Sequence, residues 1–174
     1  MLAAVAFAIN AAENAVPATA PADFQAGVFN TFLGADLKSQ FEACFTPDQA
    51  LADQTDAFIA AIKDKDWATV KSTVVALEPE AVTDAHTCHT DPQYKDVDAA
   101  YNAQELVVKN AKNDPDWQLK AIKAIRPHIA EIKASAADAQ TKWAAGDYYG
   151  AGQAIGSIDK IIFAPWETTS SFLQ

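Results

Sequence analysis

The chain has 174 residues and a formal net charge of −10, with 50% hydrophobic and 21% charged residues. This size suits one domain with a real core, and the composition is that of a globular protein rather than a disordered one. A surface this negative repels phosphate backbones and anionic lipid head groups, which argues against nucleic-acid binding and against electrostatic attachment to membranes.

The charge is distributed unevenly along the chain. Residues 1–60 hold seven acids and one base, Lys38, whereas most of the Lys and Arg residues follow Lys109. Two ends that differ in this way in their charge bias would favour head-to-tail contact between copies. The alternative is an acidic surface that only keeps the protein in solution.

The N-terminus begins with an apolar run over residues 2–9 and continues to Ala18-Thr19-Ala20, which has the form of a secretory signal and its cleavage site. Because no Lys or Arg precedes Lys38, the basic n-region is missing, and we expect the sequence to begin inside or just after such a signal. The run is far shorter than the roughly 20 residues of a membrane-spanning helix. We predict an apolar arm and linker over 1–21, a helical domain over 22–166 and a polar tail over 167–174.

Apolar residues recur at helical spacing almost throughout the chain, and the alternation typical of strands is nearly absent. A first short helix, with Phe24, Val28 and Phe32 on one face, should end at Gly34, and a second should carry Cys44. The next should start with Thr46 as N-cap, Pro47 at the first position and Gln49 completing a capping box. A further helix should open at Asp66-Trp67 and end at Pro79.

In the second half of the chain, two predicted helices start with an acid followed by proline, at Asp91-Pro92 and Asp114-Pro115. The long run after Pro115 should kink at Pro127. Its apolar stripe consists of Leu119, Ile122, Ile125, Ile129, Ile132, Ala136 and Trp143. A last helix should follow Gly146-Asp147 and stop near Pro165. Together these patterns predict an all-α fold, an antiparallel bundle of about five main helices with short connections.

The chain has two cysteines, Cys44 and Cys88. In a chain that looks exported, an even count predicts one disulfide, and the closed loop would contribute roughly 4 kcal/mol to stability. Two unrelated buried thiols are the alternative.

A search for catalytic or metal-binding patterns yields one cluster, His86-Thr87-Cys88-His89. Adjacent Cys88 and His89 rarely point into one tetrahedron and no second ligand pair exists, so a disulfide beside two loop histidines is the preferred explanation. The chain lacks a nucleophile motif, a phosphate loop and a dinucleotide fingerprint. We therefore predict a protein that is not an enzyme and that has no cofactor or metal.

Glycines gather in the last predicted helix at positions 150, 152 and 156, although each costs roughly 0.5–1 kcal/mol relative to alanine. Gly152 and Gly156 would form a smooth groove. Internal helix packing is one explanation, and a docking groove for a segment of a neighbouring copy is the other. The second explanation predicts an assembly interface made by Leu2, Val5, Phe7, Ile9, Gly152 and Gly156.

Residues 146–156, an aspartate and two tyrosines followed by spaced glycines, together with the cysteine pair, resemble a group of small secreted or cell-surface helical proteins of ciliates and other protists. The resemblance covers about the last thirty residues and the cysteines. It implies an extracellular or cell-surface location and brings no activity with it.

These features predict an extracellular structural or assembly subunit whose copies associate head-to-tail through the N-terminal segment, giving rings or filaments. One alternative is a monomeric carrier of a small apolar ligand lined by Trp67, Trp117, Trp143 and the tyrosines. Another is an accessory subunit of a larger complex. O-linked sugars are expected at Thr19, Thr168, Thr169, Ser170 and Ser171.

Overall fold

The computed structural model describes residues 16–64, 66, 69, 72 and 84–167, and none of these residues forms a strand. The all-α class is therefore confirmed. The α-helices are α2 (Ala20–Leu33), α3 (Lys38–Cys44), α4 (Gln49–Asp64), α6 (His86–Thr90), α7 (Lys95–Lys112), α8 (Trp117–Ile125), α9 (Ile129–Ala144) and α10 (Tyr148–Phe163). Short 3-10 turns are formed by Pro92–Tyr94, Arg126–His128 and Ala164–Trp166. Within these ranges, no helix combines the length and apolar character needed to cross a membrane.

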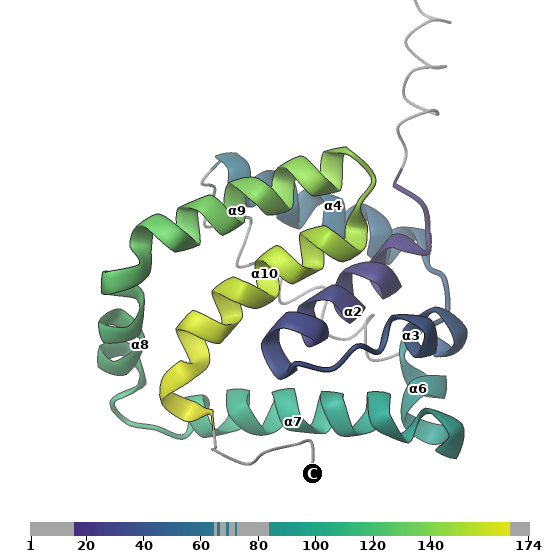
Figure 1. Cartoon of the computed structure of the whole chain (residues 1–174), viewed down its shortest axis with the longest axis horizontal. Helices are drawn as coiled ribbons and strands as arrows, with labels where there is room; N and C mark the ends of the chain where they lie inside the picture. Colours follow the sequence, from purple (N-terminus) through teal and green to yellow (C-terminus); the bar gives the residue numbers. More distant parts are fainter. Residues whose placement is uncertain (1–15, 65, 67–68, 70–71, 73–83, 168–174) are drawn as a thin grey trace, which may run out of the picture.

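The helices α2 and α10 lie side by side at the centre, and α7, α8 and α9 pass around them (Figure 1). The central pair runs parallel, because Gly152 approaches Phe24 and Gly156 approaches Val28 in the same order along both helices. The predicted antiparallel arrangement therefore does not hold for the two central helices, which run parallel.

Helix α2 starts at Ala20, inside the predicted linker, with Pro21 in its first turn. It ends at Gly34, as predicted, and Gly34 adopts the left-handed conformation with φ 74° that suits a glycine at a helix end. Because other helices cover it, α2 buries eight of its fourteen residues.

The first part of the core surrounds the predicted disulfide, which is confirmed: Cys44 and Cys88 are bonded, with 5.0 Å between their Cα atoms. Both sulfurs are buried beside Phe29 and Phe41, whose rings lie 5.4 Å apart. The bridge joins α3 to α6 across the 44-residue separation between the two cysteines.

Two further clusters complete the core. One lies between α2, α4, α9 and α10, where the Trp143 ring packs edge-on against Phe24 and its Nε1 donates to Asp56 Oδ1 at 2.8 Å. The other joins Phe32 to α7, α8 and the last 3-10 turn, where Trp166 Nε1 donates to Asp114 Oδ2 at 2.8 Å.

Helix starts were predicted with mixed success. The prediction of Thr46 as N-cap is wrong, because α4 begins at Gln49 and Asp48 Oδ1 accepts from the amide of Ala50 at 2.7 Å. The side chain of Gln49 makes no capping box and donates to Val16 O and Asp53 Oδ1 instead. At the two starts where an acid precedes proline, the acid accepts a hydrogen bond from a backbone amide, as predicted. Asp91 accepts from Gln93 N, and Asp114 accepts from Asp116 N.

The remaining boundaries follow the sequence closely. The predicted interruption at Pro127 is confirmed, since α8 ends at Ile125 and α9 begins at Ile129 after a 3-10 turn. Asp147 Oδ1 accepts from Gly150 N at 2.9 Å and caps α10. Asp66 Oδ1 accepts from Thr69 N at 3.1 Å, while most of the helix predicted up to Pro79 lies outside the described residues.

Candidate functional site

The predicted docking groove is filled by the chain's own helix α2. A Cβ atom at Gly156 would lie 2.6 Å from the carbonyl oxygen of Val28, and a Cβ at Gly152 would come closer still to that of Phe24. The contact is reciprocal, since Gly27 of α2 meets the backbone of Tyr149 and Gln153 in the same way. The prediction that Gly152 and Gly156 receive a neighbouring copy is therefore wrong, and internal packing explains both glycines.

The other half of that predicted interface, Leu2, Val5, Phe7 and Ile9, lies outside the described residues. The same is true of the expected glycan positions Thr168, Thr169, Ser170 and Ser171, whereas Thr19 stands at the start of α2.

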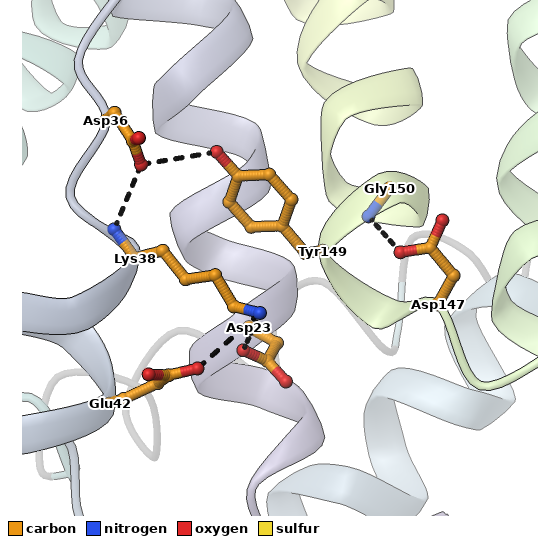
Figure 2. Close-up of polar contacts among 7 residues, drawn as sticks. All are labelled: Asp23, Asp36, Lys38, Glu42, Asp147, Tyr149 and Gly150. Atoms are coloured by element: carbon orange, nitrogen blue, oxygen red, sulfur yellow. Dashed lines mark hydrogen bonds and ion pairs between the residues drawn. The ribbon is translucent and has the colours of Figure 1, made fainter.

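A polar cluster joins α2, α3 and α10 (Figure 2). Lys38 Nζ lies 3.6 Å from Asp23 Oδ1 and 3.5 Å from Glu42 Oε1, and it stands 5.4 Å from the centre of the Tyr149 ring. The hydroxyl of Tyr149 in turn donates to Asp36 Oδ1 at 3.5 Å.

Burial and the charge of Lys38 act in opposite directions on the pKa of Asp23. Burial raises the pKa of Asp23, and the nearby ammonium of Lys38 only partly offsets that effect. A hollow of about 230 Å³ opens beside Asp23 and Glu42. Lys38 already lies between the carboxylates of Asp23 and Glu42, where a metal ion would have to bind. The cluster is therefore explained as a set of ion pairs that link α2 to α3.

The residues of the predicted histidine and cysteine cluster, 86–89, make structural contacts. The Cys88 sulfur is committed to the disulfide, and His89 Nδ1 lies 2.9 Å from Asp98 Oδ1 while its ring packs 4.5 Å from that of Tyr101. Burial raises the pKa of the Tyr101 phenol well above its usual value. Over the described part of the chain, no group of three or more His, Cys, Asp or Glu residues is placed to hold a metal ion.

The described tryptophans expected to line a ligand pocket lie apart from each other, although Trp143 packs against Tyr148 with ring centroids 4.8 Å apart. Trp143 is buried in the core, Trp117 is 48% exposed on α8, and Trp67 lies outside the described residues. A hollow of about 380 Å³ does lie between α10 and the α8–α9 corner. It is lined by Thr31, Ala124, Pro127, His128, Glu131, Ser157, Lys160, Ile161 and Ala164.

The least expected feature is the outward face of α8 and of the start of α9. Large apolar residues at helical spacing usually face the core. Leu119, Ile122 and Ile129 belong to the predicted apolar stripe, but they are 52%, 60% and 46% exposed. The residue that α8 buries is Ala121, in the cluster that contains Trp166.

Cationic residues alternate with the apolar ones on this face. Residues 119 and 122 lie on α8, residue 126 in the 3-10 turn, and residues 129 and 133 on α9. Within each helix the spacing of three or four places the two residues on one side. We call this stripe the α8–α9 ridge: Leu119, Ile122, Arg126, Ile129 and Lys133. All five are exposed, and neither Arg126 nor Lys133 forms an ion pair with another described residue. A run of lysines and arginine among isoleucines is the sequence signal that could have revealed the ridge.

Comparison of the chain with protein-family models, with curated proteins and with solved structures finds no match in any of the three. Any functional assignment therefore depends on the geometry of this chain.

Proposed function

We propose that this chain is a non-enzymatic subunit, exported to an oxidising compartment, that associates with other copies of itself through the α8–α9 ridge. The observation that carries the proposal is the exposure of Leu119 and Ile122 on α8 and of Ile129 at the start of α9. Large apolar side chains grouped on a surface mark contact sites more often than isolated ones do. The buried Cys44–Cys88 bond supports the compartment, because such bonds persist where thiols are not kept reduced.

The strength of the contact can be estimated from the exposure. Complete burial of a large aliphatic side chain is favourable by about 1.5–3 kcal/mol, so covering the exposed half of one contributes about 1 kcal/mol. The three apolar ridge residues would then give about 3 kcal/mol before the entropic cost of association. Because a Kd of about 1 mM corresponds to about 4.1 kcal/mol, apolar contact alone is too weak for assembly below that concentration. Assembly therefore needs a further contribution from the ridge cations, which would also orient the contact.

The alternative of a monomeric apolar carrier has less support. The larger hollow near Pro127 includes the charged side chains of Glu131 and Lys160 in its lining, and neither Trp117 nor Trp143 reaches it. An accessory subunit would use the same ridge against a different chain, and the experiment below separates that case.

Sedimentation equilibrium over about 10 µM to about 1 mM protein tests the proposal. We expect the average mass of the wild type to rise with concentration. Leu119→Ser should weaken association about fivefold, the equivalent of about 1 kcal/mol, and Leu119→Ser with Ile122→Ser should abolish it over this range.

A matched control removes exposed apolar surface elsewhere. Leu106 on α7 is 43% exposed, so Leu106→Ser makes the same chemical change outside the ridge and should leave the average mass unchanged. A wild type that stays monomeric throughout refutes the proposal and favours the carrier or the accessory subunit. An equal effect of Leu106→Ser would refute the ridge as the contact.

A further inference from the structure

We infer that the α8–α9 ridge of one copy docks on the outward face of α4 of a second copy, so that the cations of the ridge meet the carboxylates of α4. This inference rests on the proposed function and adds the identity of the opposite surface.

The exposed face of α4 has carboxylates towards both ends and small alanine side chains between them. We call it the α4 strip: Asp53, Asp56, Ala57, Ala60 and Asp64, all of them exposed. Asp53, Ala57, Ala60 and Asp64 follow at intervals of three or four and share one side of the helix, and Asp56 is the neighbour of Ala57 at the edge of that side. The alanines leave a shallow surface on which leucine and isoleucine side chains can lie.

The carboxylates of the strip have no cationic partner within the described ranges of the chain. Asp53 accepts from Gln49 Nε2 at 2.8 Å and Asp56 accepts from Trp143 Nε1 at 2.8 Å. None of the ion pairs of the described residues involves Asp53, Asp56 or Asp64. Among the described residues, the strip thus offers negative charge without an ion-pair partner, and the ridge offers positive charge without one.

Each surface carries two charges at a similar separation along the chain. Arg126 in the 3-10 turn and Lys133 on α9 are seven residues apart, and Asp56 and Asp64 on α4 are eight apart. Long cationic side chains are flexible enough to adjust to the remaining difference. Ile129 lies between the two cations of the ridge, and Ala60 lies between the two carboxylates of the strip.

The two surfaces belong to different elements, α8 with the start of α9 on one side and α4, which lies behind α9, on the other (Figure 1). A contact between unlike surfaces is heterologous, so each bound copy leaves a ridge and a strip free for the next. Such a contact builds rings or open filaments.

Charge exchange tests the inference by sedimentation equilibrium. Arg126→Glu with Lys133→Glu reverses the ridge, and Asp53→Lys with Asp64→Lys reverses the strip. Asp56 is left unchanged because it holds Trp143, and Asp53, three residues before it on α4, is reversed in its place. Each double variant alone should associate at least about tenfold more weakly than the wild type. An equimolar mixture of the two should regain association, because the reversed ridge then finds a reversed strip and the native ridge finds a native strip.

Matched controls reverse equal charge on α7. Lys109→Glu with Lys112→Glu alters the net charge as the ridge variant does, and Asp96→Lys with Glu105→Lys alters it as the strip variant does; all four residues are exposed. The controls should associate like the wild type. Circular dichroism of every variant checks that the helices are retained.

The outcomes separate this inference from the proposed function. A wild type that is monomeric at all concentrations overturns both. Association that the ridge variant weakens and the strip variant leaves unchanged overturns only the α4 strip as the partner surface, as does a mixture that fails to regain association. A monomer that binds vesicles of phosphatidylserine and phosphatidylcholine through its ridge would replace the second copy by a lipid surface.

Discussion

The substitution Gly152→Ala tests whether the glycines of α10 hold the core together or form a groove for a partner. The added Cβ would meet the backbone carbonyl of Phe24, far inside the 3.0 Å that real Cβ atoms keep from their neighbours. Backbone cannot rotate away as a side chain can, so α2 and α10 must separate by about 1 Å. A gap of that size removes a quarter to a half of the dispersion energy of each contact along the central pair.

The net effect is the difference between two opposing terms. Overpacking of a close contact costs about 1–3 kcal/mol, and a backbone clash lies at the upper end of this range or above it. Replacing a glycine inside a helix returns about 0.5–1 kcal/mol. We therefore expect Gly152→Ala to lower the free energy of unfolding by about 2–3 kcal/mol, which corresponds to a fall in Tm of about 5–10 °C for a chain of this size.

Urea unfolding followed by circular dichroism measures the effect, with Gly150→Ala as the matched control. A Cβ at Gly150 would meet only the carboxylate of Asp147, a side chain that can turn aside at the loss of one helix cap worth about 1 kcal/mol. That loss and the gain in helix propensity nearly cancel. If Gly152→Ala proves as stable as Gly150→Ala, or more stable than the wild type, the close packing of α2 on α10 is refuted.

Two further predictions concern the disulfide and a titrating carboxyl. Replacing Cys44 and Cys88 together by alanine should lower the free energy of unfolding in urea by about 4 kcal/mol, because the bond closes a loop over a 44-residue separation; a loss below about 1 kcal/mol would contradict this entropic account. Burial raises the pKa of Asp159 from 3.8 to about 7, so the folded chain binds a proton that the unfolded chain has released, and stability should fall as the pH rises from about 4 to about 7. Asp159→Asn should therefore be more stable than the wild type at pH 8 and equal to it near pH 4, and the same difference at both pH values would argue against this cause.

Local signals in the sequence predicted much of the fold. Gly34, Pro127 and Asp147 end, interrupt and start helices where expected, because each acts through its own backbone or through an amide a few residues away. The disulfide followed from the count of cysteines. The capping box at Thr46 failed because its amide donates to the carbonyl of Asp84 and not to the side chain of Gln49, and Asp84 is a partner far along the chain that spacing rules do not include.

The packing of the central pair could not be read from the sequence in the same way. Spaced glycines indicate close approach of something, and both the chain's own α2 and a segment of a neighbour satisfy that pattern. Only the placement of Gly27 on α2 opposite Tyr149 and Gln153 decides between them. Glycines on one helix alone would fit either internal packing or a partner segment. Glycines on both helices at the same contact indicate that α2 and α10 pack directly against each other.

The ridge was missed for a related reason. An amphipathic stripe is usually interpreted by assigning its large apolar residues to the core. In this chain the closest helix contacts are made by small residues, such as Ala121 on α8 and Ala139 on α9, so the larger residues of α8 are left outside. Over the range Trp117–Ile125, Ala121 is the only buried residue of α8, and a partner that covers Leu119 and Ile122 would add apolar burial to this helix. Assembly through the ridge would thus stabilise the helix that carries it, which makes hydrogen exchange at the amides of α8 a direct report of whether the contact has formed.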